Sequence, residues 1–183
     1  VEPMKPILVT LLAGLAVPTM AMAQEAPPAA PPAAPSEVLT GTVTDDSAWS
    51  DLGIAIPTFP TNADVPTQAS SGGTAATGRA LAQVITDDLK NNGLFKPTGP
   101  ASLPMPSLPQ VTAPDFATWQ GKGAEMVVHG FVRANADGNL TIGCYLYDVA
   151  LSQQLVKGAW VVGPGEWRRA AHKCADLVYS RLS

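Results

Sequence analysis

Hydrophobic positions alternate with polar or small ones in three consecutive runs near the end of the chain. Residues 126–133, 140–149 and 154–162 are rich in Val, Ile, Tyr, Phe and Trp, which suit a pleated, half-buried surface. The first two runs are joined by residues 134–139, which contain Asp137-Gly138, a pair typical of tight hairpin turns. The pattern predicts an antiparallel meander of three strands.

The middle run of this meander has one clearly apolar face. Side chains alternate between the two faces of a strand. One face therefore carries Leu140, Ile142, Cys144 and Leu146, and the other carries Thr141, Gly143, Tyr145 and Tyr147. We expect the helices of the chain to pack on the apolar face.

Two helices are predicted from apolar residues that recur every three or four positions. Residues 79–92 carry Leu81, Val84, Ile85 and Leu89, and Gly93 is a C-terminal stop. Residues 165–182 carry an apolar stripe formed by Trp167, Ala170, Ala171, Cys174, Leu177, Val178 and Leu182.

The remaining elements ahead of the meander are predicted to be short. Residues 52–59 alternate as a core strand that Pro57 ends or places at an edge. Residues 60–78 read as a loop, and residues 94–97 as an extended run that Pro97 closes. Six prolines make residues 97–114 irregular, and residues 114–119 form a short helical turn with Phe116 and Trp119 on one side.

The first 36 residues have the pattern of an export signal followed by a linker. Lys5, an apolar run of about eleven residues and Ala21-Met22-Ala23 are typical of a cleavable signal peptide over residues 1–23. The run is too short to span a hydrocarbon core of roughly 30 Å, so a membrane anchor is the weaker alternative. Residues 24–36 are Pro/Ala-rich, which favours a spacer over a proline-rich ligand.

Residues 37–49 have strand character without enough apolar bulk for a buried strand. One interpretation is an edge strand of the domain. The other is a detachable strand that pairs with a partner protein, where backbone hydrogen bonds supply the affinity. The residues alone leave these alternatives open.

Charge and motifs exclude several classes of function. The net charge is −4 and no cluster of basic residues occurs, so nucleic acid is an unexpected partner. His129 and His172 have no metal-ligand spacing, and no nucleophile elbow, P-loop or dinucleotide motif is present, so we expect no metal, no cofactor and no enzyme. Asp87-Asp88 could bind metal, but a solvated helix face is the preferred interpretation.

The two cysteines lie on surfaces that are predicted to meet. Cys144 is on the apolar face of the middle strand, and Cys174 is on the apolar stripe of the last helix. In an exported protein this placement favours a disulfide. Two buried free thiols are the alternative.

Several sequence blocks resemble the N-terminal domain of TolB, the periplasmic component of the Tol–Pal system. They are residues 54–59 (IAIPTF), 87–95 (DDLKNNGLF), 119–125 (WQGKGAE), 145–149 (YLYDV) and 167–179 (WRRAAHKCADLVY). The resemblance covers residues 37–183, and it implies a three-layer α/β/α domain over residues 51–183 with a mixed five-stranded sheet.

The resemblance also implies partners. In the family, the mature N-terminal segment engages the C-terminal domain of TolA, and a C-terminal β-propeller binds Pal. The propeller is absent here, so we expect no Pal binding through it. The TolA-binding segment maps onto Glu37, Val38, Leu39, Thr40, Gly41, Thr42, Val43, Thr44, Asp45 and Asp46, within an extended stretch over residues 37–50.

The sequence thus predicts a non-enzymatic periplasmic adaptor that binds TolA and helps to maintain the outer membrane and its invagination at cell division. No direct membrane insertion is expected of it. A TolB-like regulator of a peptidoglycan synthase is one alternative. A small secreted hydrolase that uses His129 or His172 is another.

Overall fold

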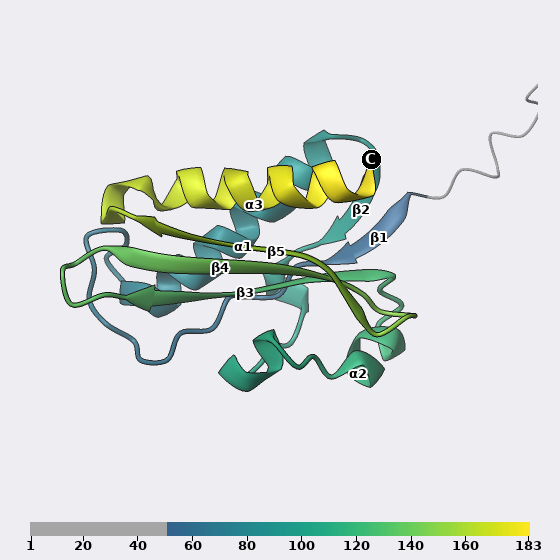
Figure 1. The fold of residues 1–183 in the computed structure, drawn as a ribbon, viewed down its shortest axis with the longest axis horizontal. Coiled ribbons are helices and arrows are strands. Elements are labelled where there is room, and N and C mark those ends of the chain that lie inside the picture. Colours follow the sequence, from purple (N-terminus) through teal and green to yellow (C-terminus); the bar gives the residue numbers. More distant parts are fainter. Residues whose placement is uncertain (1–50) are drawn as a thin grey trace, which may run out of the picture. The chain divides into compact units, whose positions relative to one another are not determined.

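The computed structural model describes residues 51–183, which form a five-stranded mixed sheet covered on both faces (Figure 1). The sheet order is β2-β1-β3-β4-β5. Its strands are β1 (Leu52–Ala55), β2 (Phe95–Thr98), β3 (Met126–Ala134), β4 (Leu140–Asp148) and β5 (Gln153–Val162). Strand β1 is parallel to both of its neighbours, whereas β3, β4 and β5 are antiparallel.

The predicted meander is confirmed within one residue at its strand ends. Gly138 has a φ of 85° in the first turn, a conformation that glycine adopts without steric cost. The Oδ1 atom of Asp137 accepts the backbone N–H of Asn139 at 3.0 Å. In the second turn, Oδ1 of Asp148 accepts the N–H of Leu151 at 2.8 Å. Short polar side chains therefore hold both turns.

The larger part of the core lies between the sheet and two helices, α1 (Gly73–Asn91) and α3 (Trp167–Leu182), which share one face of the sheet (Figure 1). The predicted apolar face of β4 is entirely buried there. The fully inaccessible residues of this cluster include Leu81, Ile85, Leu89, Val128, Ile142, Leu146, Ala170 and Val178.

Helix α1 begins six residues earlier than the predicted residue 79. The early residues are glycines, threonines and alanines, which carry no apolar stripe, so their pattern did not reveal the helix. Contacts with a distant part of the chain fix this turn instead. The backbone N–H of Phe59 donates to the Gly78 carbonyl at 3.3 Å. A Cβ atom at position 78 would overlap the carbonyl oxygen of Phe59, so only glycine fits there. The hydroxyl of Thr77 also donates to the Gly73 carbonyl at 3.0 Å. Packing has overridden weak helix propensity.

The prediction of a strand through residue 59 was too long, and the prediction that Pro97 ends the next strand was also wrong. Strand β1 stops at Ala55, although the N–H of Ile56 still donates to the Thr98 carbonyl at 2.9 Å. Pro97 lies inside β2, paired with Ile54. Because β2 is an edge strand, a residue without an N–H is tolerated there.

The opposite face of the sheet is covered by smaller elements. Helix α2 (Phe116–Gly121) confirms the helical turn predicted for residues 114–119, and the 3-10 turn η2 (Leu108–Val111) lies on the same face. The proline-rich stretch contains η2 and a further 3-10 turn, η1 (Pro100–Ser102), so it is less irregular than predicted. A capping box between Ser107 and Gln110 starts η2. A second, smaller cluster lies beneath these elements and contains Ala55, Trp119, Val127, Tyr147 and Val149.

The last helix is also shorter than predicted. A 3-10 turn, η3 (Pro164–Glu166), takes the place of its first two residues, and α3 starts at Trp167. With α1 and α3 on one face and α2 on the other, the predicted three-layer α/β/α architecture is confirmed.

Candidate binding sites

The predicted TolA-binding residues, Glu37 to Asp46, lie outside the described residues, as do the predicted signal peptide and linker. Their assignment stays a prediction. The described chain begins immediately before β1, which has β2 on one side and β3 on the other. The segment ahead of residue 51 is thus joined directly to an inner strand of the sheet.

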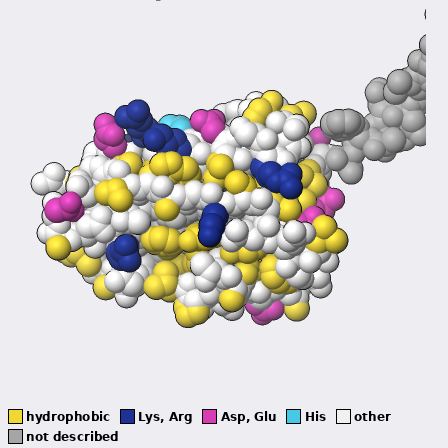
Figure 2. All heavy atoms as spheres, in the orientation of Figure 1, with side chains coloured by type: hydrophobic (Ala, Val, Ile, Leu, Met, Phe, Trp, Pro, Cys, Tyr) yellow, Lys and Arg dark blue, Asp and Glu magenta, His cyan; other side chains and the backbone are white. Residues whose placement is uncertain are grey.

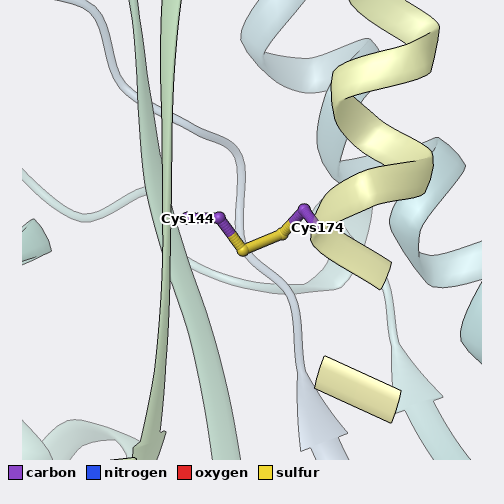
Figure 3. The surroundings of a disulfide bond; sticks show 2 residues. All are labelled: Cys144 and Cys174. Carbon is purple, nitrogen blue, oxygen red and sulfur yellow. A yellow bond between two sulfur atoms is a disulfide. The ribbon is translucent and has the colours of Figure 1, made fainter. Parts of the chain in front are cut away.

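A disulfide joins Cys144 of β4 to Cys174 of α3, as the sequence predicted (Figure 3). The two Cα atoms are 5.9 Å apart, and both side chains are fully buried. The described residues contain no free cysteine. The thiol that a cysteine-dependent enzyme would need is therefore consumed by a structural cross-link between the central meander and the last helix.

The outer surface of α3 carries paired charges. Figure 2 shows basic and acidic side chains next to one another along the edge that α3 occupies. Glu166 lies 3.6 Å from Arg169, and Nδ1 of His172 lies 2.6 Å from Oδ2 of Asp88 on α1. Glu166, Arg169 and His172 are exposed and Asp88 is half-buried, so we interpret the surface as a solvated face with a helix–helix contact.

The neighbouring carboxylates of α1 have different partners. Asp87 accepts a hydrogen bond from Nε2 of Gln83 at 2.9 Å, whereas Asp88 pairs with His172. Between residues 51 and 183, no group of three or more His, Cys, Asp or Glu side chains is placed to hold a metal ion. The two aspartates have separate partners, as expected for residues about 100° apart around a helix.

His129 is buried on the opposite face of the sheet, against α2. Its Nδ1 atom lies 2.9 Å from the carbonyl oxygen of Gln110. Because a carbonyl only accepts, Nδ1 must carry the proton in this hydrogen bond. The ring meets Trp119 and Tyr147 edge-on, with centroids 5.4 and 5.9 Å away. Burial lowers the pKa of His129 to about 4, against the opposing effect of hydrogen bonds that the ring donates to the backbone of Gln110 and Val111.

Tyr147 completes this polar cluster within an apolar layer. Its hydroxyl donates to the Val111 carbonyl at 2.8 Å, so both His129 and Tyr147 hold the η2 turn against the sheet. Burial, with a smaller contribution from Tyr145, raises the pKa of Tyr147 to about 12. Both side chains are therefore neutral near pH 7, which avoids the cost of a buried charge.

A cavity of about 140 Å³ lies beside this cluster. Its lining includes Met105, Gln110, Asp115, Thr118, Trp119 and His129. Nε2 of His129 is buried and has no hydrogen-bond partner among residues 51–183. The sequence did not reveal this site because half of its lining residues come from the proline-rich stretch, for which no regular structure was predicted. The one available signal was that His129 lies in the predicted meander, ten positions after Trp119.

The two histidines cannot serve a common site. His129 is paired in register with Tyr145 and faces α2, whereas His172 belongs to α3 on the other face of the sheet. The cysteines that could assist either histidine are joined to one another. Among the described residues, neither histidine is hydrogen-bonded to a hydroxyl or thiol that could act as a nucleophile.

No helix within residues 51–183 has the length and hydropathy needed to cross a bilayer.

The sheet and its two helical layers define a small α/β/α domain. Comparison with known proteins identifies its family: the family model of the TolB amino-terminal domain matches residues 43–155, so the chain belongs to the TolB amino-terminal domain family. This confirms the resemblance seen in the sequence.

Named relatives agree with this family assignment. The chain is 68% identical to Tol-Pal system protein TolB 1 of Novosphingobium aromaticivorans, over 79% of this chain and 32% of the relative. It is 46% identical to Tol-Pal system protein TolB of Sphingopyxis alaskensis, over 91% of this chain and 35% of the relative. The crystal structure of TolB from Acinetobacter baumannii is 25% identical, with a TM-score of 0.55, over 73% of this chain and 29% of that one. The chain thus spans about a third of the length of its curated relatives.

Proposed function

We propose that this chain is the amino-terminal part of a Tol–Pal system component that acts as a non-enzymatic periplasmic adaptor, with residues 37–46 binding the C-terminal domain of TolA. The adaptor helps to maintain the outer membrane and its invagination at cell division, and it takes part in protein import. The observation that carries the proposal is membership of the TolB amino-terminal domain family.

The position of residues 37–46 supports a role as a binding strand. They overlap the start of the matched region, which begins at residue 43, and the region aligned with the Sphingopyxis alaskensis protein covers 91% of the chain, so it spans them wherever it begins. Val38, Thr40, Thr42 and Thr44 alternate with Leu39, Gly41 and Val43. Such a segment can add to the edge of a partner's sheet, where main-chain hydrogen bonds give affinity and alternate side chains give specificity.

The described domain supports the role of a scaffold. Its meander is cross-linked to the last helix, and its two clusters bury both faces of the sheet. A disulfide persists in an oxidising compartment, which agrees with export through the predicted signal peptide and with a periplasmic location. Binding and stability are then separate properties of separate segments.

Deleting residues 37–46 tests the proposal. We expect the melting temperature of the domain to stay unchanged and calorimetric binding of the TolA C-terminal domain to be abolished. Unchanged TolA binding after the deletion would contradict the proposal.

A proline scan of the same segment tests the mode of binding. Proline removes one backbone N–H donor. In a paired strand, alternate N–H groups face the partner, so proline at Thr40, Gly41, Thr42 and Val43 should weaken TolA binding at every second position. Alanine at the same four positions is the matched control. Equal loss at all four prolines would argue against strand pairing and would leave the deletion result to decide whether the segment binds.

A further inference from the structure

The cavity beside His129 is lined by hydrogen-bond acceptors and by apolar side chains. Nε2 of His129 carries the free lone pair of the ring, because Nδ1 donates to the Gln110 carbonyl. Thr118 donates its hydroxyl proton to Oδ2 of Asp115 at 2.8 Å, which leaves the Thr118 oxygen as an acceptor. Asp115 supplies a carboxylate. The polar side of the cavity therefore favours a ligand that donates hydrogen bonds.

The charge of the cavity lining indicates which kind of hydrogen-bond donor the cavity favours. Asp115 brings a negative charge, and no Lys or Arg lines the cavity. Trp119 offers an aromatic ring, and ammonium or guanidinium groups are attracted to such rings. Met105 and two prolines give the remaining wall an apolar character that matches an aliphatic stem. Acceptors, a carboxylate and an indole in one cavity together favour a cation over a neutral donor.

The cavity is much larger than a single bound water requires. By the same measure of volume, one water needs about 10–15 Å³, whereas this cavity offers about 140 Å³. Met105 at its rim is 62% exposed, so the cavity opens to solvent beside a residue that can move aside. A group the size of a short alkylammonium can enter from outside.

We propose that this cavity binds a primary ammonium group on a short aliphatic stem, with Nε2 of His129 and the carboxylate of Asp115 accepting its hydrogen bonds and Trp119 packing against it. The side chain of a lysine in a partner protein and a free alkylamine share this chemistry. The site is on the face of the sheet opposite α1 and α3.

NMR of the full chain with ¹⁵N-labelled histidine tests the proposal directly. The probes are N-acetyl-lysine methylamide, n-butylammonium and the neutral N-acetyl-norleucine methylamide. We expect both ammonium probes to shift the Nε2 resonance of His129 with a saturable, millimolar dependence, and the neutral probe to leave it unchanged. Saturation by n-butylammonium alone would still support the ammonium site and would assign it to free amines instead of lysine side chains.

Two variants test whether the negative charge of Asp115 contributes to ammonium binding. Asp115→Asn keeps a side chain that can cap α2 and removes the negative charge, so binding of the lysine probe should weaken about fivefold. Asp176→Asn makes the same change on the exposed face of α3 and should have no effect. Three results would overturn the proposal: no saturable shift with either ammonium probe, equal binding of the neutral probe, or equal weakening by both variants.

Discussion

The two faces of the sheet are built in different ways. The face beneath α1 and α3 is closed by long helices, a disulfide and a large apolar cluster, and the buried hydroxyls of Thr77 and Thr86 donate to carbonyls of α1 itself. The face beneath α2 is closed by short turns, and the neutral rings of His129 and Tyr147 are buried there and bonded to backbone carbonyls of another element. The first face is thus specialised for stability, whereas the second retains hydrogen-bonding groups and a cavity that a ligand can use.

The largest effect should come from breaking the cross-link on the helical face. Replacing Cys144 and Cys174 together with alanine opens a loop that spans 30 positions. In the chain-entropy model this lowers the free energy of unfolding by about 3.5 kcal/mol. Denaturant titration of the double variant measures the loss. A matched loss on reducing the wild-type protein supports the cross-link as its cause, whereas no difference between oxidised and reduced protein would contradict it.

The next largest effect should be a pH dependence that originates on the other face. The pKa of His129 is about 4 in the folded chain, against 6.5 for an unperturbed histidine, so the unfolded chain binds more protons between these values. The stability that this residue contributes is therefore complete above pH 6.5 and falls as the pH drops, by about 3 kcal/mol at pH 4.

Variants at the two histidines separate this effect from other titrations. His129→Phe should flatten the dependence of unfolding free energy on pH in this window, because the titrating ring is gone. His172→Gln removes the exposed histidine and should keep the part of the slope that His129 contributes. If His129→Phe shows the wild-type slope, the buried neutral histidine is not its source.

The smallest of the three effects is the loss of stability when one of two adjacent buried valines, one on each face of the sheet, is truncated. Val128 is fully buried against the helical cluster, and Val127 is fully buried against the smaller one. We expect Val128→Ala to lower the free energy of unfolding by about 2–3 kcal/mol and Val127→Ala by about 1–2 kcal/mol, because short turns relax into a cavity more easily than cross-linked helices. Chemical denaturation of both variants measures the two losses. A larger loss of unfolding free energy for Val127→Ala than for Val128→Ala would contradict the assignment of greater stability to the helical face.

The sequence predicted the helical face better than the other. Regular alternation in residues 140–146 and the stripe of α3 identified both partners of the buried interface and the cysteines that join them. These features are local and periodic, so they can be read from one chain. The early start of α1 could not be read from the sequence in this way. It depends on Gly78 fitting against the Phe59 carbonyl, and these two residues are distant in sequence.

The His129 site was hidden for a similar reason. Its ring was placed in a strand, but its hydrogen-bond partner is a backbone carbonyl, which any residue at position 110 would supply. The cavity depends on how η2 and α2 pack over the sheet, and proline content gave no measure of that packing. Side-chain patterns identify faces, whereas cavities arise from the spaces between elements.

The inner position of β1 has a mechanical consequence. Tension applied to the chain ahead of residue 51 reaches the domain through a strand that is parallel to its neighbours on both sides, β2 and β3. A pull along such a strand loads the hydrogen bonds of both ladders at the same time, so they resist together in shear instead of opening one after another. A partner that pulls on the leading segment would therefore meet a firm anchor.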